Sequence, residues 1–205
     1  MPLAIEVLTS GWLADNYIEI LGVISSLIYL YFSVRQKIWL WPFGILSSSF
    51  FIYIFYHSKF YAGMSLQVYY LIISFYGWYH WSAGQKGDDT PQLPVTRLKL
   101  KTGLIAAAVF TVLFITIAQI LDRFTNSDVP WGDSFTATGS VIATWMLARK
   151  ILEHWLLWII IDALAVTLYF YKGMYPTVTL YIVYTIIAVF GYFQWKKSII
   201  QDVQK

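Results

Sequence analysis

Long apolar segments dominate this sequence, and they constrain its fold more than any other feature. A helix needs about 20 mostly apolar residues to cross the ~30 Å hydrocarbon core of a bilayer. Seven segments approach that length: residues 16–34, 39–56, 62–81, 102–121, 134–148, 152–171 and 174–195. The sequence therefore predicts an all-α integral membrane protein with seven transmembrane helices. Little chain remains outside these segments, so residues 1–205 are predicted to form a single membrane domain without a soluble catalytic domain.

The composition agrees with a membrane protein and excludes several kinds of site. Apolar residues make up 59% of the chain and charged residues only 12%, against about 25% charged in a typical soluble domain. There is no cysteine, which excludes disulfides and thiolate metal sites. The amino terminus lacks the pattern of a cleaved signal peptide, and no phosphate-binding loop for ATP is present. We expect no cofactor, no metal and no nucleic-acid partner.

The distribution of lysine and arginine predicts the orientation in the membrane. With the amino terminus outside, the inner segments hold eleven of these residues: Arg35, Lys37, Lys86, Arg97, Lys99, Lys101, Arg149, Lys150, Lys196, Lys197 and Lys205. The outer segments hold three: Lys59, Arg123 and Lys172. Because basic residues concentrate on the cytoplasmic side, the carboxyl terminus is predicted to be cytoplasmic. Six acids on the outer side either favour the approach of cations or are simply tolerated there: Glu6, Asp15, Glu19, Asp122, Asp128 and Asp133.

The two halves of the chain resemble each other at a spacing of 114 residues. At this offset, matching landmarks include Arg35 with Arg149, Trp41 with Trp155, Gly77 with Gly191, and Trp81 with Trp195. The prediction is a first three-helix repeat at 16–81, a linker helix at 102–121 and a second repeat at 131–195. A single intervening helix returns both repeats to the same sense, which gives a parallel 3+1+3 arrangement like that of SWEET transporters. The Gly-, Pro- and charge-rich segment Gly84–Arg97 is predicted to be a flexible linker.

A carboxylate lies near the middle of the sixth apolar segment. Trp155, Trp158 and Asp162 follow one another at i, i+3 and i+7, so they share one helix face. Asp162 lies about ten residues into the span, ~15 Å along the helix, and ionisable groups at this depth usually face a cavity. Indole rings beside a carboxylate would recognise an aromatic cation by stacking and cation–π attraction. Alternatively, Trp155 belongs to an interfacial aromatic belt and a protonated Asp162 only joins two helices.

Three further polar side chains are candidates for the same site. Gln67 lies in the third segment, and Tyr181 occupies the equivalent place in the second half. The Gln67 amide would either bind a ligand or hydrogen-bond a neighbouring helix. Glu19 lies nearer the outer surface, either as a vestibule charge or as an ordinary interfacial acid.

Several motifs resemble the PnuC family of bacterial vitamin transporters. The resemblance rests on SLQVYYLIISFYGWYHW (Ser65–Trp81), VPWGDSF (Val129–Phe135), EHWLLWIIIDALAVTLY (Glu153–Tyr169) and YKGMYPTVTLYIVYTIIAVFGYFQWKK (Tyr171–Lys197). It implies a homotrimer in the bacterial inner membrane, facilitated diffusion of a vitamin, and trapping of that vitamin by a cytoplasmic kinase. It also implies that Trp155, Trp158, Asp162 and Gln67 line the substrate site.

At position 162 the sequence departs from the pattern of the nicotinamide riboside transporters that it resembles. Those transporters have asparagine at the equivalent place, whereas this sequence has Asp162. An asparagine side chain both donates and accepts hydrogen bonds, whereas an ionised aspartate only accepts. That property suits the exocyclic amine of thiamine, and the charge suits its thiazolium ring. The sequence therefore favours thiamine as substrate, with nicotinamide riboside as the alternative.

Other classes of membrane protein fit the sequence less well. A retinal-binding receptor would need a lysine within the seventh span, and none is present there. An intramembrane hydrolase would need a buried nucleophile with a base, but His57, His80 and His154 all lie at span ends. The chain is therefore not predicted to be an enzyme. A purely structural membrane protein remains an alternative to the transporter.

Overall fold

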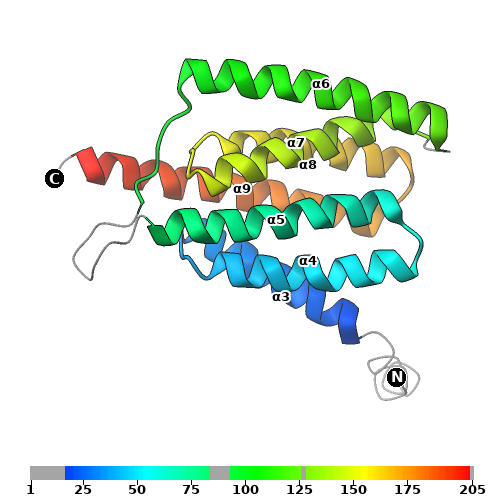
Figure 1. Ribbon diagram of the computed structural model, residues 1–205, viewed down its shortest axis with the longest axis horizontal. Helices are drawn as coiled ribbons and strands as arrows, with labels where there is room; N and C mark the ends of the chain where they lie inside the picture. Colours follow the sequence, from blue (N-terminus) through cyan, green and yellow to red (C-terminus); the bar gives the residue numbers. More distant parts are fainter. Residues whose placement is uncertain (1–16, 84–92, 126–127, 204–205) are drawn as a thin grey trace. The chain divides into compact units, whose positions relative to one another are not determined.

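The described part of the protein is almost wholly helical. The computed structural model describes residues 17–83, 93–125 and 128–203, and Figure 1 shows their arrangement. The helices within these ranges are α3 (Tyr17–Val34), α4 (Leu40–His57), α5 (Tyr61–Ala83), α6 (Leu100–Phe124), α7 (Pro130–Ala148), α8 (His154–Tyr171) and α9 (Tyr175–Val203). Glu6, Asp15, Lys86, Lys205 and residues 84–92 of the predicted linker lie outside the described residues.

The helices match the seven predicted segments, with differences at two ends. We predicted the fifth helix from residue 134, with an outer end extending to about Trp131, and α7 begins at Pro130, because proline is well tolerated in the first turn of a helix. The last helix, α9, ends at Val203, eight residues beyond the predicted end at 195. Within the described ranges, four helices are long and apolar enough to cross a membrane: Tyr17–Val34, Leu100–Phe124, His154–Tyr171 and Thr177–Ile200. The helix α7 is less apolar because serines and threonines are interspersed along it.

The chain divides into two compact units. The first comprises α3, α4 and α5 as far as Phe75, and the second comprises residues 34–36 and Tyr76–Lys205. In the first unit, Ser47 Oγ on α4 donates a hydrogen bond to the Gly22 carbonyl oxygen on α3 at 3.3 Å. In the second unit, α6 packs against α7, α7 against α8, and α8 against α9. These contacts place α8 between two neighbouring helices of its own unit.

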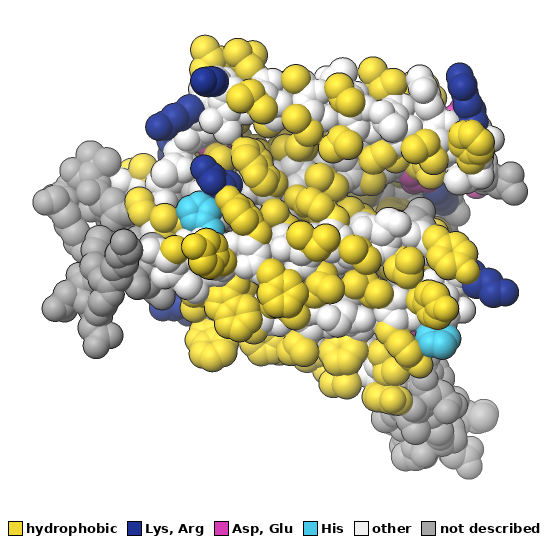
Figure 2. Space-filling view, in the orientation of Figure 1, with side chains coloured by type: hydrophobic (Ala, Val, Ile, Leu, Met, Phe, Trp, Pro, Cys, Tyr) yellow, Lys and Arg dark blue, Asp and Glu magenta, His cyan; other side chains and the backbone are white. Residues whose placement is uncertain are grey.

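The outer surface of α6 shows the character expected of a helix in lipid. Leu104, Ile105 and Val112 are all exposed there, and few α6 side chains are buried within the structure. Figure 2 shows hydrophobic side chains along this helix, with lysine and arginine side chains near its ends. An apolar helix exposed in this way is stable in a bilayer rather than in water.

Part of the predicted flexible linker is fixed by backbone hydrogen bonds. Thr96 N–H donates to the Lys150 carbonyl oxygen and Leu152 N–H donates to the Thr96 carbonyl oxygen, both at 2.9 Å. Leu98 N–H donates to Glu153 Oε2 at 2.8 Å. The prediction of a flexible segment is therefore wrong for residues 93–97, because the α7–α8 turn provides partners for their backbone groups.

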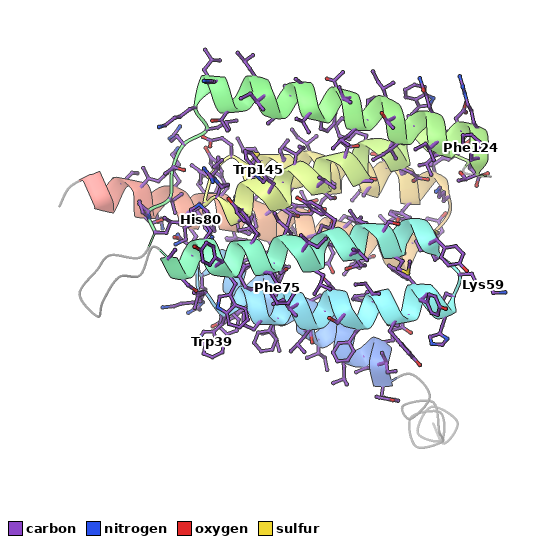
Figure 3. The ribbon with its side chains drawn as sticks, in the orientation of Figure 1. Trp39, Lys59, Phe75, His80, Phe124 and Trp145 are labelled. Atoms are coloured by element: carbon purple, nitrogen blue, oxygen red, sulfur yellow. The ribbon has the colours of Figure 1, made fainter. Side chains whose placement is uncertain are left out.

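The buried Lys150 side chain strengthens the same attachment. Its Nζ donates to the Leu93 carbonyl oxygen at 2.8 Å and lies 4.4 Å from the centroid of the Trp81 ring. Trp81 Nε1–H donates to the Ala148 carbonyl oxygen at 3.1 Å. Close by, Trp145 of α7, labelled in Figure 3, packs on the apolar cluster of Ile142, Met146 and Ile151. Together these contacts hold the residues from Leu93 to the beginning of α6 against the α7–α8 turn.

The backbone follows the same 114-residue offset as the sequence landmarks. The helix α4 spans Leu40–His57 and α8 spans His154–Tyr171, so both ends differ by 114. Two pairs of turn residues with positive φ also match: Gln36 (55°) with Lys150 (51°), and Lys59 (57°, labelled in Figure 3) with Gly173 (70°). Each half therefore uses a left-handed residue at the same two turns.

Candidate functional site

The contact between α8 and α9 contains most of the predicted site residues. On α8 these lie on the stripe of residues 155, 158, 162, 165 and 169, and α9 carries the same spacing at 181, 184, 188, 191 and 195. Tyr169 stacks on Tyr181, with ring centroids 5.2 Å apart and an interplanar angle of 17°. At the opposite end, the Trp155 and Trp195 ring centroids are 6.0 Å apart. These two contacts show that α8 and α9 pack antiparallel. Their facing residues recur at alternating intervals of three and four, as in coiled coils.

Asp162 lies between these two aromatic contacts, near the middle of α8. The residue is only 4% exposed, and Tyr184 of α9 lies near its carboxylate. The register places Asp162 level with Ala188 of α9, and both Ala188 and Ala165 are buried. A buried carboxylate in this position is a natural partner for a cation.

Trp155 closes one end of the α8–α9 contact. Its indole is 2% exposed and its ring centroid lies 4.6 Å from that of His154. A Cβ atom built on Gly191 would lie 2.6 Å from the indole carbons, so glycine is required for this close approach. The Trp155 Nε1–H has no hydrogen-bond partner among the described residues. Trp158, one turn nearer Asp162, is only half-buried.

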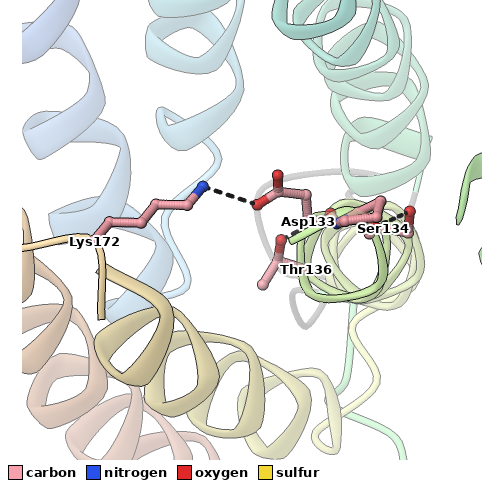
Figure 4. A network of polar contacts seen from close by, with 5 residues as sticks. Asp133, Ser134, Thr136 and Lys172 are labelled. Carbon is pink, nitrogen blue, oxygen red and sulfur yellow. Dashed lines mark hydrogen bonds and ion pairs between the residues drawn. The ribbon is translucent and has the colours of Figure 1, made fainter. Parts of the chain in front are cut away.

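The helix α7 packs closely against α8 at two glycines. Cβ atoms built on Gly139 and Gly132 would each lie 2.8 Å from the side chains of Ile161 and Leu168 of α8, respectively. Near the start of α7, Asp133 forms an ion pair with Lys172 at 3.7 Å, drawn in Figure 4. The antiparallel register fixed by the two glycines places Thr138 level with Asp162.

The remaining predicted residues belong to the first unit, which is described separately. Gln67 is half-buried on α5, and Glu19 is exposed in the first turn of α3. The structure therefore places Trp155, Asp162 and Tyr181 along one pair of helices, with Trp155 and Tyr181 each about two turns from Asp162 in opposite directions. It describes Gln67 and Glu19 only within their own unit.

Comparison with known proteins identifies the family. Residues 16–197 match the sequence model of the nicotinamide mononucleotide transporter family. The chain belongs to this family. The matched range includes all of α8 and the part of α9 up to Lys197.

Individual relatives are vitamin transporters that align with most of the chain. The nicotinamide riboside transporter PnuC of Escherichia coli K12 is 27% identical over 207 residues, covering 89% of this chain and 86% of its own. The riboflavin/roseoflavin transporter RibM of Streptomyces davaonensis is 28% identical over 181 residues, covering 86% and 83%. Nicotinamide riboside transporter PnuC of Neisseria mucosa is 24% identical over 209 residues, covering 97% and 79%.

A solved structure shares the fold. The crystal structure of the vitamin B3 transporter PnuC superposes with a TM-score of 0.71 at 23% identity, covering 97% of this chain and 88% of that chain. The resemblance found in the motifs is thus confirmed, and the protein is a multi-pass membrane protein of a vitamin transporter family. Two of the relatives named here are nicotinamide riboside transporters and the third is a riboflavin/roseoflavin transporter. They fit the alternative substrate, nicotinamide riboside, better than thiamine, which the sequence favoured.

Proposed function

We propose that this protein mediates the uptake of nicotinamide riboside. The observation that carries the proposal is Asp162, a carboxylate 4% exposed at the middle of α8, in a chain whose family transports such vitamins. Nicotinamide riboside is an aromatic cation, so a buried negative charge supplies the attraction that its pyridinium ring requires. Trp158 on the same helix face supplies an aromatic wall, and contact of a cation with such a ring contributes about 0.5–2 kcal/mol.

The proposed site lies on α8 and α9 within the second unit. Asp162 and Trp158 of α8 would contact the pyridinium ring, and Trp155 and Tyr181 would line the path about two helical turns to either side of Asp162. In the first unit, Gln67 and Glu19 are proposed separately as substrate contacts, on the sequence alone. The stacked Tyr169 and Tyr181 rings support an aromatic lining beyond Asp162. Riboflavin, the substrate named for RibM, is uncharged at its ring system and would not use the carboxylate in this way.

We further propose how transport is driven and assembled. As the resemblance to the PnuC family implies, transport is facilitated diffusion in the inner membrane, and a cytoplasmic kinase traps the vitamin as its phosphate. The functional assembly is a homotrimer, for which the exposed apolar faces of the helices provide packing surface. A purified protein with the mass of one or two chains would contradict the trimer.

Uptake into liposomes tests the proposed function. Vesicles containing the purified protein should accumulate radiolabelled nicotinamide riboside until the inner and outer concentrations are equal, without ATP or an ion gradient. Adding a riboside kinase and ATP inside the vesicles should raise the accumulated label well above that level. Empty vesicles provide the control, and uptake of thiamine in preference to nicotinamide riboside would contradict the substrate.

The orientation is testable by reporter fusions. The inner excess of lysine and arginine leads us to expect cytoplasmic reporter activity for fusions after residue 101 and at the carboxyl terminus. Fusions within residues 122–133 should report an external position, since α6 separates the two regions. A cytoplasmic signal from residues 122–133 would overturn the assignment.

We also propose that residues 16–81 and 131–195 are parallel repeats joined by the linker helix. The equal offset of helix ends and of left-handed turn residues supports this division. Both observations concern the internal geometry of each half. They add to the matching tryptophan, arginine and glycine landmarks of the sequence.

A further inference from the structure

Asp162 differs from the half-buried carboxylates of its own unit in having no partner for its charge. Asp133 forms an ion pair with Lys172 at 3.7 Å (Figure 4), and Glu153 Oε2 accepts a hydrogen bond from the Leu98 N–H at 2.8 Å. Asp162 is more deeply buried, yet no hydrogen bond or ion pair reaches its carboxylate from the residues that the structure describes. Neither a cation nor a hydrogen-bond donor among these residues therefore balances its charge.

The helices that pack against α8 within the second unit bring no cation to this carboxylate. These helices are α7 and α9. The ionisable side chain of α7 is Asp133, an acid. The ionisable group of α9 near Asp162 is the Tyr184 phenol, which carries no positive charge in either protonation state. The side chains of α8 and α9 that can carry a positive charge lie about two helical turns from the level of Asp162: His154, Lys196 and Lys197.

A buried carboxylate without a partner is much less stable as an anion than as a neutral acid. Moving an isolated ionised carboxylate out of water costs so much free energy that such a group commonly binds a proton instead. A cation placed beside the carboxylate reverses this preference, because it attracts the ionised form. A proton and a substrate cation are therefore alternative partners for one buried carboxylate.

We propose that Asp162 holds a proton while the site is empty and releases it when the cationic substrate binds. The neutral carboxylic acid and the free cation become a carboxylate–cation pair and one proton, which passes to the solvent, so charge is balanced. Acid therefore weakens substrate binding, because protons compete with the substrate for the carboxylate. This inference rests on the proposed function, since it assigns the substrate as a cation that binds at Asp162.

Calorimetry on the purified full-length protein measures the released proton. Nicotinamide riboside is added in buffers that differ in their enthalpy of ionisation, and the difference in binding heat gives the number of protons released. We expect about one proton per bound substrate at the acidic end of a series between about pH 5 and pH 8. Where the proton is released, the dissociation constant should fall about tenfold for each rise of one pH unit.

Three variants assign the proton to its residue. Asp162→Asn removes the titrating group, so it should bind nicotinamide riboside without proton release and with a dissociation constant independent of pH. Tyr184→Phe should still release the proton, which separates the carboxylate from the neighbouring phenol. Asp133→Asn is the matched control, because this carboxylate already has Lys172 as its partner, and it should release the proton as the wild type does.

Infrared spectroscopy of the wild type repeats the test should the Asp162→Asn variant fail to fold. The absorption band of a protonated carboxyl group should be present in the empty protein and disappear on addition of nicotinamide riboside. Binding to the wild type without proton release throughout the pH series, or undiminished release from folded Asp162→Asn protein, would overturn the inference. Wild-type protein that does not bind nicotinamide riboside would instead overturn the proposed function.

Discussion

Asp162→Ala should weaken the binding of nicotinamide riboside more than any other single change in the site. The substitution leaves the pyridinium cation without its buried counter-charge, and truncating one partner of such a pair commonly costs ~2–5 kcal/mol. Asp162→Asn should cost less, because the amide retains an acceptor and complements a carboxamide. The measurement is the dissociation constant of each variant, determined by calorimetry on protein that elutes as one species.

Binding of thiamine distinguishes the charge of Asp162 from its hydrogen bonding to the substrate. Asparagine would direct its N–H group at the exocyclic amine of the aminopyrimidine, so Asp162→Asn should impair any thiamine binding more than that of nicotinamide riboside. Asp128→Ala removes an exposed acid near the start of α7 and controls for general attraction of cations. Wild-type affinity in folded Asp162→Ala protein would assign the carboxylate to helix packing alone.

Trp158→Ala should produce the second-largest loss of affinity. Trp158 shares a helix face with Asp162 and is half-buried, so its indole is available for stacking on the pyridinium ring. Stacking of an aromatic side chain on a nucleobase is worth about 1–3 kcal/mol, and we expect a loss in that range here. Trp158→Phe should lose less, since an aromatic face remains. Initial rates of uptake into vesicles, at several substrate concentrations, report the change.

Trp39 supplies the control for removing an indole. It is 60% exposed before α4 and is labelled in Figure 3, so Trp39→Ala should leave substrate affinity unchanged. A similar loss of substrate affinity in Trp39→Ala and Trp158→Ala would indicate that removing any indole perturbs the protein as a whole. Normal affinity in a folded Trp158→Ala variant would place the aromatic wall elsewhere.

The sequence predicted the helices well, because spanning segments are defined mainly by length and apolar content. It also predicted that Trp155 and Asp162 share one face of α8, which follows directly from helical periodicity. It could not predict that Gly191 receives the Trp155 indole, since that contact depends on the register between two helices. The substrate preference followed from one residue, and the relatives now favour the alternative vitamin.

The hydroxyls of α7 show why the hydrogen bonding of side chains is harder to predict than a fold. Ser134, Ser140 and Thr144 each donate to the carbonyl oxygen four residues earlier. The Thr138 hydroxyl has no hydrogen-bond partner among the described residues, and the residue type does not reveal that difference. The attachment of Thr96 to the α7–α8 turn was equally invisible in the sequence. A segment rich in glycine, proline and charge resembles a linker even where part of it is held in place.

The left-handed turns also bear on the ancestry of the protein. A non-glycine residue with positive φ costs roughly 1–2 kcal/mol, yet Gln36, Lys59 and Lys150 all adopt this conformation. Descent of both halves from one duplicated gene would explain why unrelated side chains carry the same costly backbone at matching positions. Since the duplication, the residues would have diverged while the turn geometry was inherited, and only position 173 now carries the glycine that removes the strain.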